Sequence, residues 1–349
     1  MKVKEGLRQP GVLAALGAAL LFGAGTPVAK ILLNGINPWL LAALLYLGSG
    51  LGLFLYRRLR RLPPARPSRR DLPWLAGAIA AGGVIAPVLL MAGLNAMPAS
   101  GASLLLNAEG VFTALLAWFA FKENVDGRIA LGMAAIIGGT LVLSWPGGAH
   151  FAGIWPVLAI MGACFAWAMD NNLTRKVSLT DAGWLAAIKG LVAGAVNLCL
   201  AFAVGMTLPS WPYLLVALTV GFLAYGVSLT LFIIALRHLG TARTGAYFSV
   251  APFIGVLLAI IMGDPVTFRM IAAGMLMALG LWLHLTERHR HEHGHEALLH
   301  DHEHSHDEHH QHSHPASEMS SGRHRHPHYH PPLVHTHPHF PDSHHRHTH

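Results

Sequence analysis

Residues 103–118 read SLLLNAEGVFTALLAW, an apolar stretch that is interrupted by Asn107 and Glu109. The stretch lies within a longer apolar segment, 98–121, which is long enough to cross the hydrocarbon layer of a bilayer as one helix. An ionisable side chain near the centre of such a helix costs about 2.5–3.5 kcal/mol on insertion scales, so Glu109 needs a structural or functional reason. The stretch predicts a membrane helix with a carboxylate near its middle.

Similar apolar segments fill most of the chain. Of the 349 residues, 53% are hydrophobic and only 12% are charged, whereas a soluble domain carries about 25% charged residues. We therefore expect an all-α integral membrane protein with ten transmembrane helices. The predicted spans are 11–33, 38–56, 72–93, 98–121, 128–145, 152–173, 182–205, 212–236, 243–262 and 269–286.

Basic residues alternate between the predicted loops. The second, fourth, sixth and eighth loops hold Lys or Arg, whereas of the other loops only the ninth does, through Arg269. Because cytoplasmic loops carry an excess of Lys and Arg, the pattern predicts a multi-pass protein of the cytoplasmic (inner) membrane with both termini in the cytoplasm. The basic charge thus arises from membrane loops, and we expect the lipid bilayer, not nucleic acid, as the partner.

An internal repeat divides the ten spans into two halves. Residues 38–43 (PWLLAA) are echoed by 183–187 (GWLAA), and Leu115–Ala117 align with Leu257–Ala259. Five helices per half is an odd number, so the second half must be inverted, and the exchange of basic and uncharged loops agrees. Inverted repeats place a binding site near the midplane. The expected domains are a cytoplasmic N-terminus (1–9), two five-helix repeats (10–145 and 150–286) and a C-terminal tail (289–349).

The residues 103–118, followed by Glu123, resemble the second half of an EamA-type repeat, which defines a branch of the drug/metabolite transporter superfamily. The likeness covers residues 10–286. A glutamate-proline pair is common in the family; here Glu109 precedes Gly110, and a proline follows Ala251 in the second repeat. The resemblance implies ten helices, inverted halves and secondary active transport of small solutes such as amino acids or nucleobase-like metabolites.

Polar residues inside the spans are the candidates for substrate binding or coupling. Glu109 is either a proton- or substrate-coupling carboxylate or a structural group that neighbouring helices satisfy. Asp170 and Lys189 lie at similar depth on consecutive helices, and either form an ion pair or line an inner cavity that binds charged groups of the substrate. Lys30 is expected to snorkel outward, with a role in substrate binding as the alternative. The full candidate set is Asn107, Glu109, Asp170, Asn171, Asn172 and Lys189.

Nothing in the spans indicates an enzyme. A nucleophile with a histidine base is missing from every span, and the glycines of 48–52 lack the strand and helix context of a phosphate loop. Cys164 and Cys199 are interpreted as buried small hydrophobes. We expect no catalysis and no required cofactor.

The tail holds 23 of the 26 histidines, in a tandem duplication of 289–314 and 324–349. His-x-His spacing lets two or three imidazoles close on one Zn²⁺, Ni²⁺, Co²⁺ or Cu²⁺ ion, without choosing among them. Such a tail cannot bury a core, so we expect it to be disordered without metal. A solvated low-complexity tail and a pH sensor are the alternatives. The candidate ligands are His291, His293, His295, His300, His302, His304, His306, His326, His328, His330, His335, His337 and His339.

Three functional hypotheses follow from the sequence. The leading one is a permease that moves a small solute by alternating access and carries a cytoplasmic metal-binding tail. The second is a transition-metal transporter, although the spans lack His/Asp pairs at helical spacing. The third is a membrane-anchored metal buffer or sensor. The sequence leaves the oligomeric state open, with a homodimer as one arrangement.

Overall fold

A computed structural model describes residues 10–62, 68–121, 127–145, 153–178 and 180–285, and four short strands in the tail. The chain divides into two units, Met1–Glu287 and Arg288–His349, each of which is described by itself. In the first unit the helices follow the predicted spans. They are α2 (Pro10–Leu32), α3 (Pro38–Leu59), α4 (Leu72–Ala78), η1 (Ile79–Ile85), α5 (Ala86–Asn95), α6 (Ala99–Leu105), α7 (Ala108–Phe121), α8 (Gly127–Ser144), α9 (Ile154–Val177), α10 (Ala182–Ala203), α11 (Trp211–Val220), η2 (Gly221–Val227), α12 (Ser228–Phe248), α13 (Ala251–Ile261) and α14 (Phe268–Leu285).

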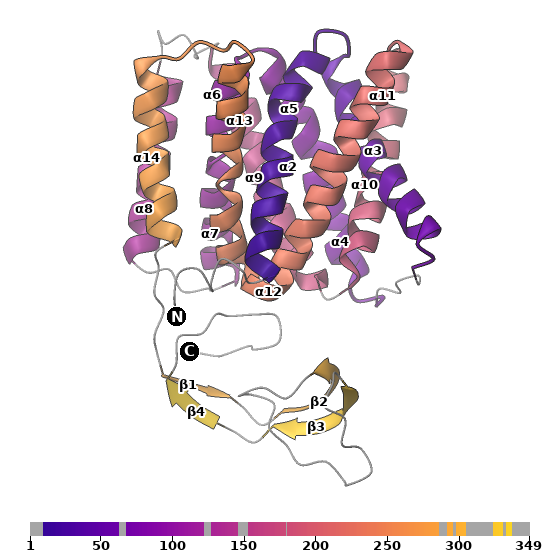
Figure 1. Ribbon diagram of the computed structural model, residues 1–349, viewed down its shortest axis with the longest axis vertical. Helices are drawn as coiled ribbons and strands as arrows, with labels where there is room; N and C mark the ends of the chain where they lie inside the picture. The colour runs from indigo at the N-terminus through magenta and orange to yellow at the C-terminus, as the bar shows by residue number, and fades with distance from the viewer. Residues whose placement is uncertain are drawn as a thin grey trace. The chain divides into compact units, whose positions relative to one another are not determined.

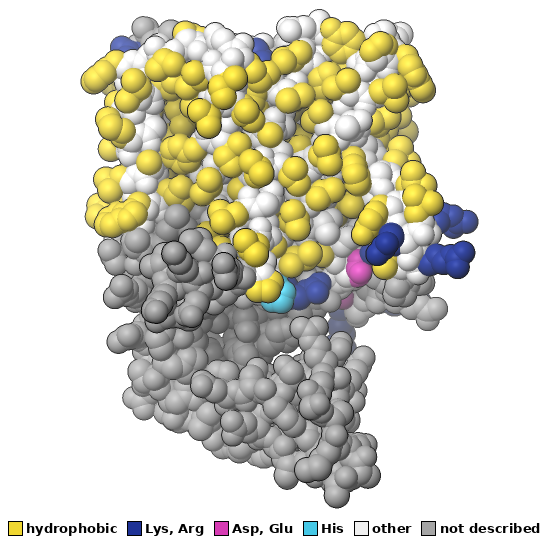
Figure 2. Space-filling view, in the orientation of Figure 1, with side chains coloured by type: hydrophobic (Ala, Val, Ile, Leu, Met, Phe, Trp, Pro, Cys, Tyr) yellow, Lys and Arg dark blue, Asp and Glu magenta, His cyan; other side chains and the backbone are white. Residues whose placement is uncertain are grey.

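The described helices confirm an all-helical membrane fold. Seven helical stretches are at least 18 residues long and apolar enough to cross a membrane, and three shorter apolar helices complete the ten predicted spans. Figure 2 shows hydrophobic side chains covering the visible face along the helices, with Lys and Arg toward the edges. Phe54 in α3 is 51% exposed and Phe268 at the start of α14 is 82% exposed. Large exposed apolar side chains on this scale fit lipid, not water.

Equivalent helices of the two halves begin in the same way. Asn37 precedes α3, and its side chain accepts a hydrogen bond from the backbone N–H of Trp39 at 2.9 Å. Asp181 precedes α10 and accepts from the backbone N–H of Trp184 at 2.7 Å. Both side chains satisfy a backbone donor that the first helical turn leaves free. The sequence echo between residues 38–43 and 183–187 therefore marks two capped helix starts.

The two halves interlock through reciprocal helix pairs. The second span (α3) packs on the seventh (α10), and the fifth (α8) on the tenth (α14); α8 and α14 lie side by side in Figure 1. The first span (α2) packs on α12 and α13, just as the sixth (α9) packs on α5 and α7. Each contact thus has a counterpart in the other half, as expected for inverted repeats.

Glycines allow these helices to approach closely. A Cβ atom on Gly190 of α10 would lie 2.5 Å from the backbone nitrogen of Gly50 in α3. A Cβ atom on Gly50 would lie 2.3 Å from the nitrogen of Leu191. The two backbones touch here, so any side chain would force α3 and α10 apart.

Two irregularities recur at equivalent places in both halves. The third and eighth spans each contain a seven-residue π-helical segment, η1 and η2, which begin 142 residues apart, at Ile79 and Gly221. The fourth and ninth spans are each interrupted, and the helices resume at Ala108 and Ala251, 143 residues apart. Both kinds of irregularity are typical of functional sites in membrane helices.

Two predictions are wrong in detail. The loop expected between the eighth and ninth spans, at 237–242, is helical, because α12 continues to Phe248. The ninth span therefore combines the end of α12 with α13, since no proline or turn residue pair ends the helix earlier. Cys164 is buried as expected, but Cys199 is exposed on the surface of α10, which is compatible with an apolar lipid environment.

The tail contains two antiparallel strand pairs. β1 (Glu292–His295) pairs with β4 (Leu333–Thr336), and β2 (Leu298–His304) pairs with β3 (His324–His330). The two copies of the duplicated sequence thus pair with each other. Such backbone hydrogen bonds between the copies do not require a hydrophobic core. The rest of the tail lies outside the described residues.

Candidate functional site

Glu109 lies at the interruption of the fourth span. Helix α6 ends at Leu105 and α7 begins at Ala108, which places Glu109 in the first turn of α7. Backbone N–H groups of a first helical turn have no partner within the helix, so this position favours a negative charge. The interruption therefore explains how a carboxylate can be tolerated in the middle of a span.

Asn171 of α9 holds the Glu109 carboxylate. The Asn171 side-chain amide donates to Glu109 Oε1 at 2.8 Å and to the Thr113 hydroxyl at 3.3 Å. Among the described residues no other side chain donates to this carboxylate. Glu109 is half-buried and borders two adjoining pockets, so its second oxygen remains available to a ligand.

Asp170 and Lys189 form a buried ion pair between α9 and α10. Lys189 Nζ donates to Asp170 Oδ1 at 2.5 Å and to the Thr174 hydroxyl at 2.9 Å, and Thr174 donates to Asp170 at 2.7 Å. The exposed fractions of the two charged side chains are 2% for Lys189 and 8% for Asp170. Gly82 in η1 makes room for the pair, because a Cβ atom there would lie 2.0 Å from Asp170 Oδ2.

Three further polar side chains of the spans, those of Asn107, Asn172 and Lys30, form hydrogen bonds with backbone carbonyls. Asn107 donates to the carbonyl of Leu104 and contacts the sulfur of Met277 in α14. Asn172 donates to the carbonyls of Thr113 and Ala168. Lys30 caps α5, donating to the carbonyls of Leu94 at 2.8 Å and Asn95 at 3.1 Å, an arrangement that suits the negative end of a helix. These side chains connect helices.

A central cavity brings both halves together at Glu109. The space open to atoms inside it is about 60 Å³, which is small beside the about 300–1,000 Å³ of most small-molecule sites. Glu109, Asp170 and Asn171 are the sequence candidates that line it, whereas Asn107, Asn172 and Lys189 are not among its lining residues. The lining residues are Phe22, Tyr46, Glu109, Trp167, Asp170, Asn171, Ala224, Tyr225, Ser228, Leu229, Phe232 and Phe248.

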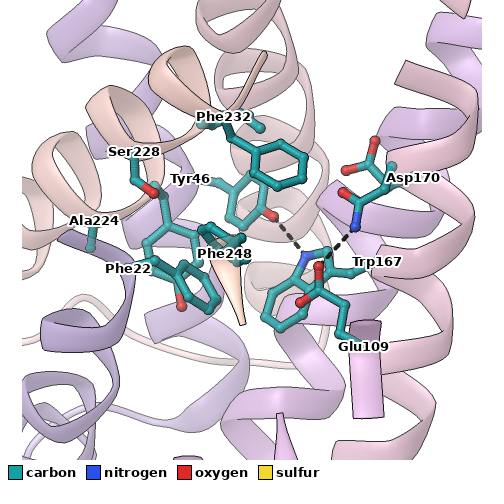
Figure 3. Close-up of a pocket in the computed structure, with 12 residues that line it drawn as sticks. Phe22, Tyr46, Glu109, Trp167, Asp170, Ala224, Ser228, Phe232 and Phe248 are labelled. Atoms are coloured by element: carbon teal, nitrogen blue, oxygen red, sulfur yellow. Dashed lines mark hydrogen bonds between the residues drawn. The ribbon is translucent and has the colours of Figure 1, made fainter. Parts of the chain in front are cut away.

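Six of the twelve lining residues are aromatic, and none of them was predicted from the sequence. The ring of Phe22 contacts Trp167, Tyr225 and Phe248, with centroids 5.4–5.7 Å apart. Figure 3 shows the rings of Phe22, Phe248 and Trp167 around a common space, with Glu109 beside Trp167. Most of the tryptophans lie near span ends, where they favour the membrane interface. Trp167, in the middle of α9, is the signal that could have indicated a buried aromatic site.

The π-helical segment η1 is fastened to this wall. The hydroxyl of Tyr46 donates to the carbonyl of Gly82 at 2.6 Å, and Trp167 Nε1 donates to the same carbonyl at 3.0 Å. Asn197 of α10 donates to the next carbonyl, that of Gly83, at 3.0 Å. A π-helix shifts its backbone hydrogen bonds and frees carbonyls for such partners. The wall and the irregular helix therefore depend on each other.

The tail candidates can be placed only by their backbone. His293 and His295 lie in β1, and His335 lies in β4. Six more candidates lie in the β2–β3 pair, and His291, His306, His337 and His339 lie outside the described residues. Within the part of the chain whose side chains are described, no group of three or more His, Cys, Asp or Glu residues could hold a metal ion.

A helical membrane protein whose inverted halves share a central cavity with a carboxylate has the architecture of a membrane transporter. The chain belongs to the EamA-like transporter family, whose model matches residues 9–145 and again 154–286.

Named relatives agree with this class. An "Uncharacterized transporter" of Methanothermobacter thermautotrophicus is 29% identical over 297 residues, which cover 78% of this chain and 85% of the relative. The "Uncharacterized inner membrane transporter YedA" of Escherichia coli K12 is 26% identical and covers 74% and 84%, respectively. A "Probable amino-acid metabolite efflux pump" of the same strain is 31% identical over 173 residues, which is 49% of this chain and 54% of that relative.

One solved structure supports the fold alone. A crystal structure of a protein with 17% sequence identity superposes with a TM-score of 0.64 over 80% of this chain and 99% of the other.

Proposed function

We propose that this protein is a secondary transporter that moves a small organic solute across the cytoplasmic membrane by alternating access, with the central cavity as its binding site. The observation that carries the proposal is the position of the cavity, which takes its wall from both repeats and contains Glu109. Broken helices at a repeat interface are the usual position of substrate and coupling sites in secondary transporters.

Glu109 is the proposed coupling carboxylate. It combines a helix start, a single amide donor and access to the cavity, so it can exchange a proton or a ligand charge during the cycle. The Asp170–Lys189 pair is internally neutralised, and we assign it to the structure of the wall. This division gives the two carboxylates different roles.

Counterflow in proteoliposomes tests this proposal. The full chain is reconstituted from detergent into liposomes. The liposomes are loaded with unlabelled amines, amino acids or nucleobases, and uptake of the same labelled compound from outside is followed. We expect Glu109→Gln to reduce exchange of the transported solute at least tenfold, while the same change beyond α14, Glu287→Gln, leaves it unaltered. Equal activity of the two variants would contradict the role of Glu109.

Both termini are proposed to lie in the cytoplasm, with the transporter in the inner membrane. The alternation of basic and uncharged loops supports this orientation. A reporter that fluoresces only in the cytoplasm, fused after His349, is expected to be fluorescent, whereas a fusion that is active only outside the inner membrane would contradict the assignment.

The tail is proposed to bind Zn²⁺, Ni²⁺, Co²⁺ or Cu²⁺ at the cytoplasmic face, as an accessory to transport. The observation that supports this is its histidine density, 23 residues within 289–349. A metal substrate is the second candidate; the residues that line the described cavity include two carboxylates and no histidine, which favours an organic solute.

Cellular metal content separates these ideas. Nickel, cobalt, zinc and copper are measured in cells that express the full chain, the chain ending at Arg288, or Glu109→Gln at matched levels. If the protein is a metal buffer, its effect on cellular metal content disappears when the tail is removed and persists in Glu109→Gln. If Glu109→Gln abolishes the effect of the full chain, metal passes through the core, and the organic-solute proposal is wrong.

A further inference from the structure

The cavity joins a continuous set of aromatic rings to a carboxylate. Beyond its three ring contacts, Phe22 is linked through Phe248 to Phe232, with ring centroids 4.9 Å apart, and through Tyr225 to Tyr46 at 5.5 Å. Together with Trp167 these six rings line one pocket; we call them the aromatic box. Figure 3 shows the rings of Phe22, Phe232 and Phe248 near Glu109 and Trp167. The faces of aromatic rings carry partial negative charge and attract cations.

The charge of the lining residues is one-sided. Glu109 and Asp170 are acidic, and none of the residues that line this pocket is Lys or Arg. Lys189 does not line the pocket, and its ammonium group donates hydrogen bonds to Asp170 and Thr174. Asp170 is therefore neutralised within the protein, whereas Glu109 receives only the amide of Asn171. A ligand that brings a positive group would supply the charge that Glu109 lacks.

The same inventory disfavours other ligand classes. An anionic solute would face Glu109 with no cationic side chain among the lining residues to receive it. A zwitterion would satisfy Glu109 with its ammonium group, but its carboxylate would meet no cation in the pocket, only neutral donors such as the Tyr225 and Ser228 hydroxyls and the Asn171 amide. The Ser228 hydroxyl already donates to the carbonyl of Ala18 at 2.9 Å. Burying a charge without a partner is costly.

We propose that the aromatic box binds a small organic cation, an amine or a quaternary ammonium group with an apolar substituent, and that Glu109 is its counter-ion. The proposal rests on the proposed function, since it names the substrate class of the same cavity. Phe22 is the central ring of the aromatic box, because it contacts the rings of Trp167, Tyr225 and Phe248. We therefore expect its removal to weaken cation binding.

The test is a binding measurement on the purified full chain in lipid nanodiscs, by titration calorimetry. The probe is benzyltrimethylammonium, and its uncharged match is 2-methyl-1-phenylpropan-2-ol, which has nearly the same shape. We expect the cation to bind at least tenfold more tightly than the alcohol. Glu109→Gln is expected to abolish this preference, and Phe22→Leu to weaken the cation at least fivefold while changing the alcohol less than twofold.

Phe54→Leu is the matched control, because Phe54 is an exposed phenylalanine of α3 outside the cavity lining. It is expected to bind the cation like the unaltered chain. Only variants whose thermal unfolding midpoint equals that of the unaltered chain are compared. Equal affinity for the cation and the alcohol, or equal effects of Phe22→Leu and Phe54→Leu, would overturn the proposal. If Phe22→Leu does not fold, Phe22→Tyr retains the ring and must retain the preference.

Counterflow on the same preparations separates this proposal from the transporter function. If the cation fails to bind while another solute still exchanges in a Glu109-dependent way, the substrate class is wrong and the function stands. If the cation binds through Phe22 and Glu109 but no solute exchanges, the binding site stands and the transport proposal falls.

Discussion

At the scale of single residues, burial separates the two carboxylates of the cavity. Asp170 is accommodated inside the membrane part because Lys189 and Thr174 both bond to one of its oxygens. Glu109 keeps its place because it starts a helix and accepts one amide. The Asp170 carboxylate is thus neutralised within the protein, whereas the Glu109 carboxylate can still bind a ligand.

The ion pair predicts non-additive changes in stability. Asp170→Asn leaves the Lys189 ammonium buried without its counter-ion, so we expect the free energy of unfolding to fall by about 3–5 kcal/mol. Asp170→Asn combined with Lys189→Met removes both charges and should cost less than Asp170→Asn alone. Unfolding in mixed detergent micelles measures each value. A double variant that costs the sum of the single ones would show that the two charges act independently.

Gly82 predicts a steric effect at the same place. Gly82→Ala would place a methyl group 2.0 Å from Asp170 Oδ2, and overpacking of this kind costs about 1–3 kcal/mol. Gly138→Ala in α8 is the control, because nothing lies within 4 Å of its Cβ position. There the change should stabilise the helix, by about 0.5–1 kcal/mol. Similar effects of both substitutions in unfolding experiments would contradict the close approach.

At the scale of elements, hydropathy was enough to place the spans but not their irregularities. Pro38 and Pro73 stand in the first turns of α3 and α4, where the preference of proline for helix starts can be read directly from the sequence. The π-helical segments η1 and η2 contain ordinary apolar and glycine residues. Their geometry comes from partners in other helices, which a hydropathy pattern does not contain. The continuation of α12 past residue 237 was not predicted because hydropathy falls at Arg237, although no proline ends the helix there.

The hydrogen bonds to η1 predict a measurable local effect. Tyr46→Phe removes the donor at 2.6 Å from the Gly82 carbonyl, which keeps only Trp167. We expect a loss of about 0.5–1.5 kcal/mol in the free energy of unfolding and faster amide hydrogen exchange in 79–85. Tyr56→Phe changes the same helix at a side chain that is 50% exposed and should do neither. Unchanged exchange in η1 would show that this hydroxyl does not hold the segment.

At the scale of the whole molecule, the repeat could be inferred from the sequence, whereas the site was inferred only in part. Loop charges and the GWLAA echo are local features that survive in a single sequence, and they predict the inverted architecture. Glu109 and Asp170 were recognisable because charge is rare in spans. The aromatic box was not, because Phe22 and Tyr225 resemble any apolar side chain until the fold brings the two halves together.

Contacts between the halves occur at both ends of the spans. At one end Arg57 of α3 forms an ion pair with Asp181, which precedes α10. At the opposite end Asp264 accepts from the backbone N–H of Ser100 in α6 at 2.8 Å. Alternating access requires each end of the transporter to open in turn. Each of these two contacts therefore helps to hold closed the end at which it lies.

Removing one charge should therefore shift access toward its own side. Asp181→Asn retains an acceptor for the α10 cap but loses the ion pair, which is worth about 0.2–1 kcal/mol, so access from that end should rise by up to about fivefold. Asp264→Asn should shift access toward the other end. Ser228→Cys, in a chain without Cys164 and Cys199, reports the change through its labelling rate with an impermeant thiol reagent applied from either side of sealed vesicles, because Ser228 lines the cavity. If the two variants shift labelling toward the same side, these contacts do not work as opposed gates, since alternating access demands that what opens one end closes the other.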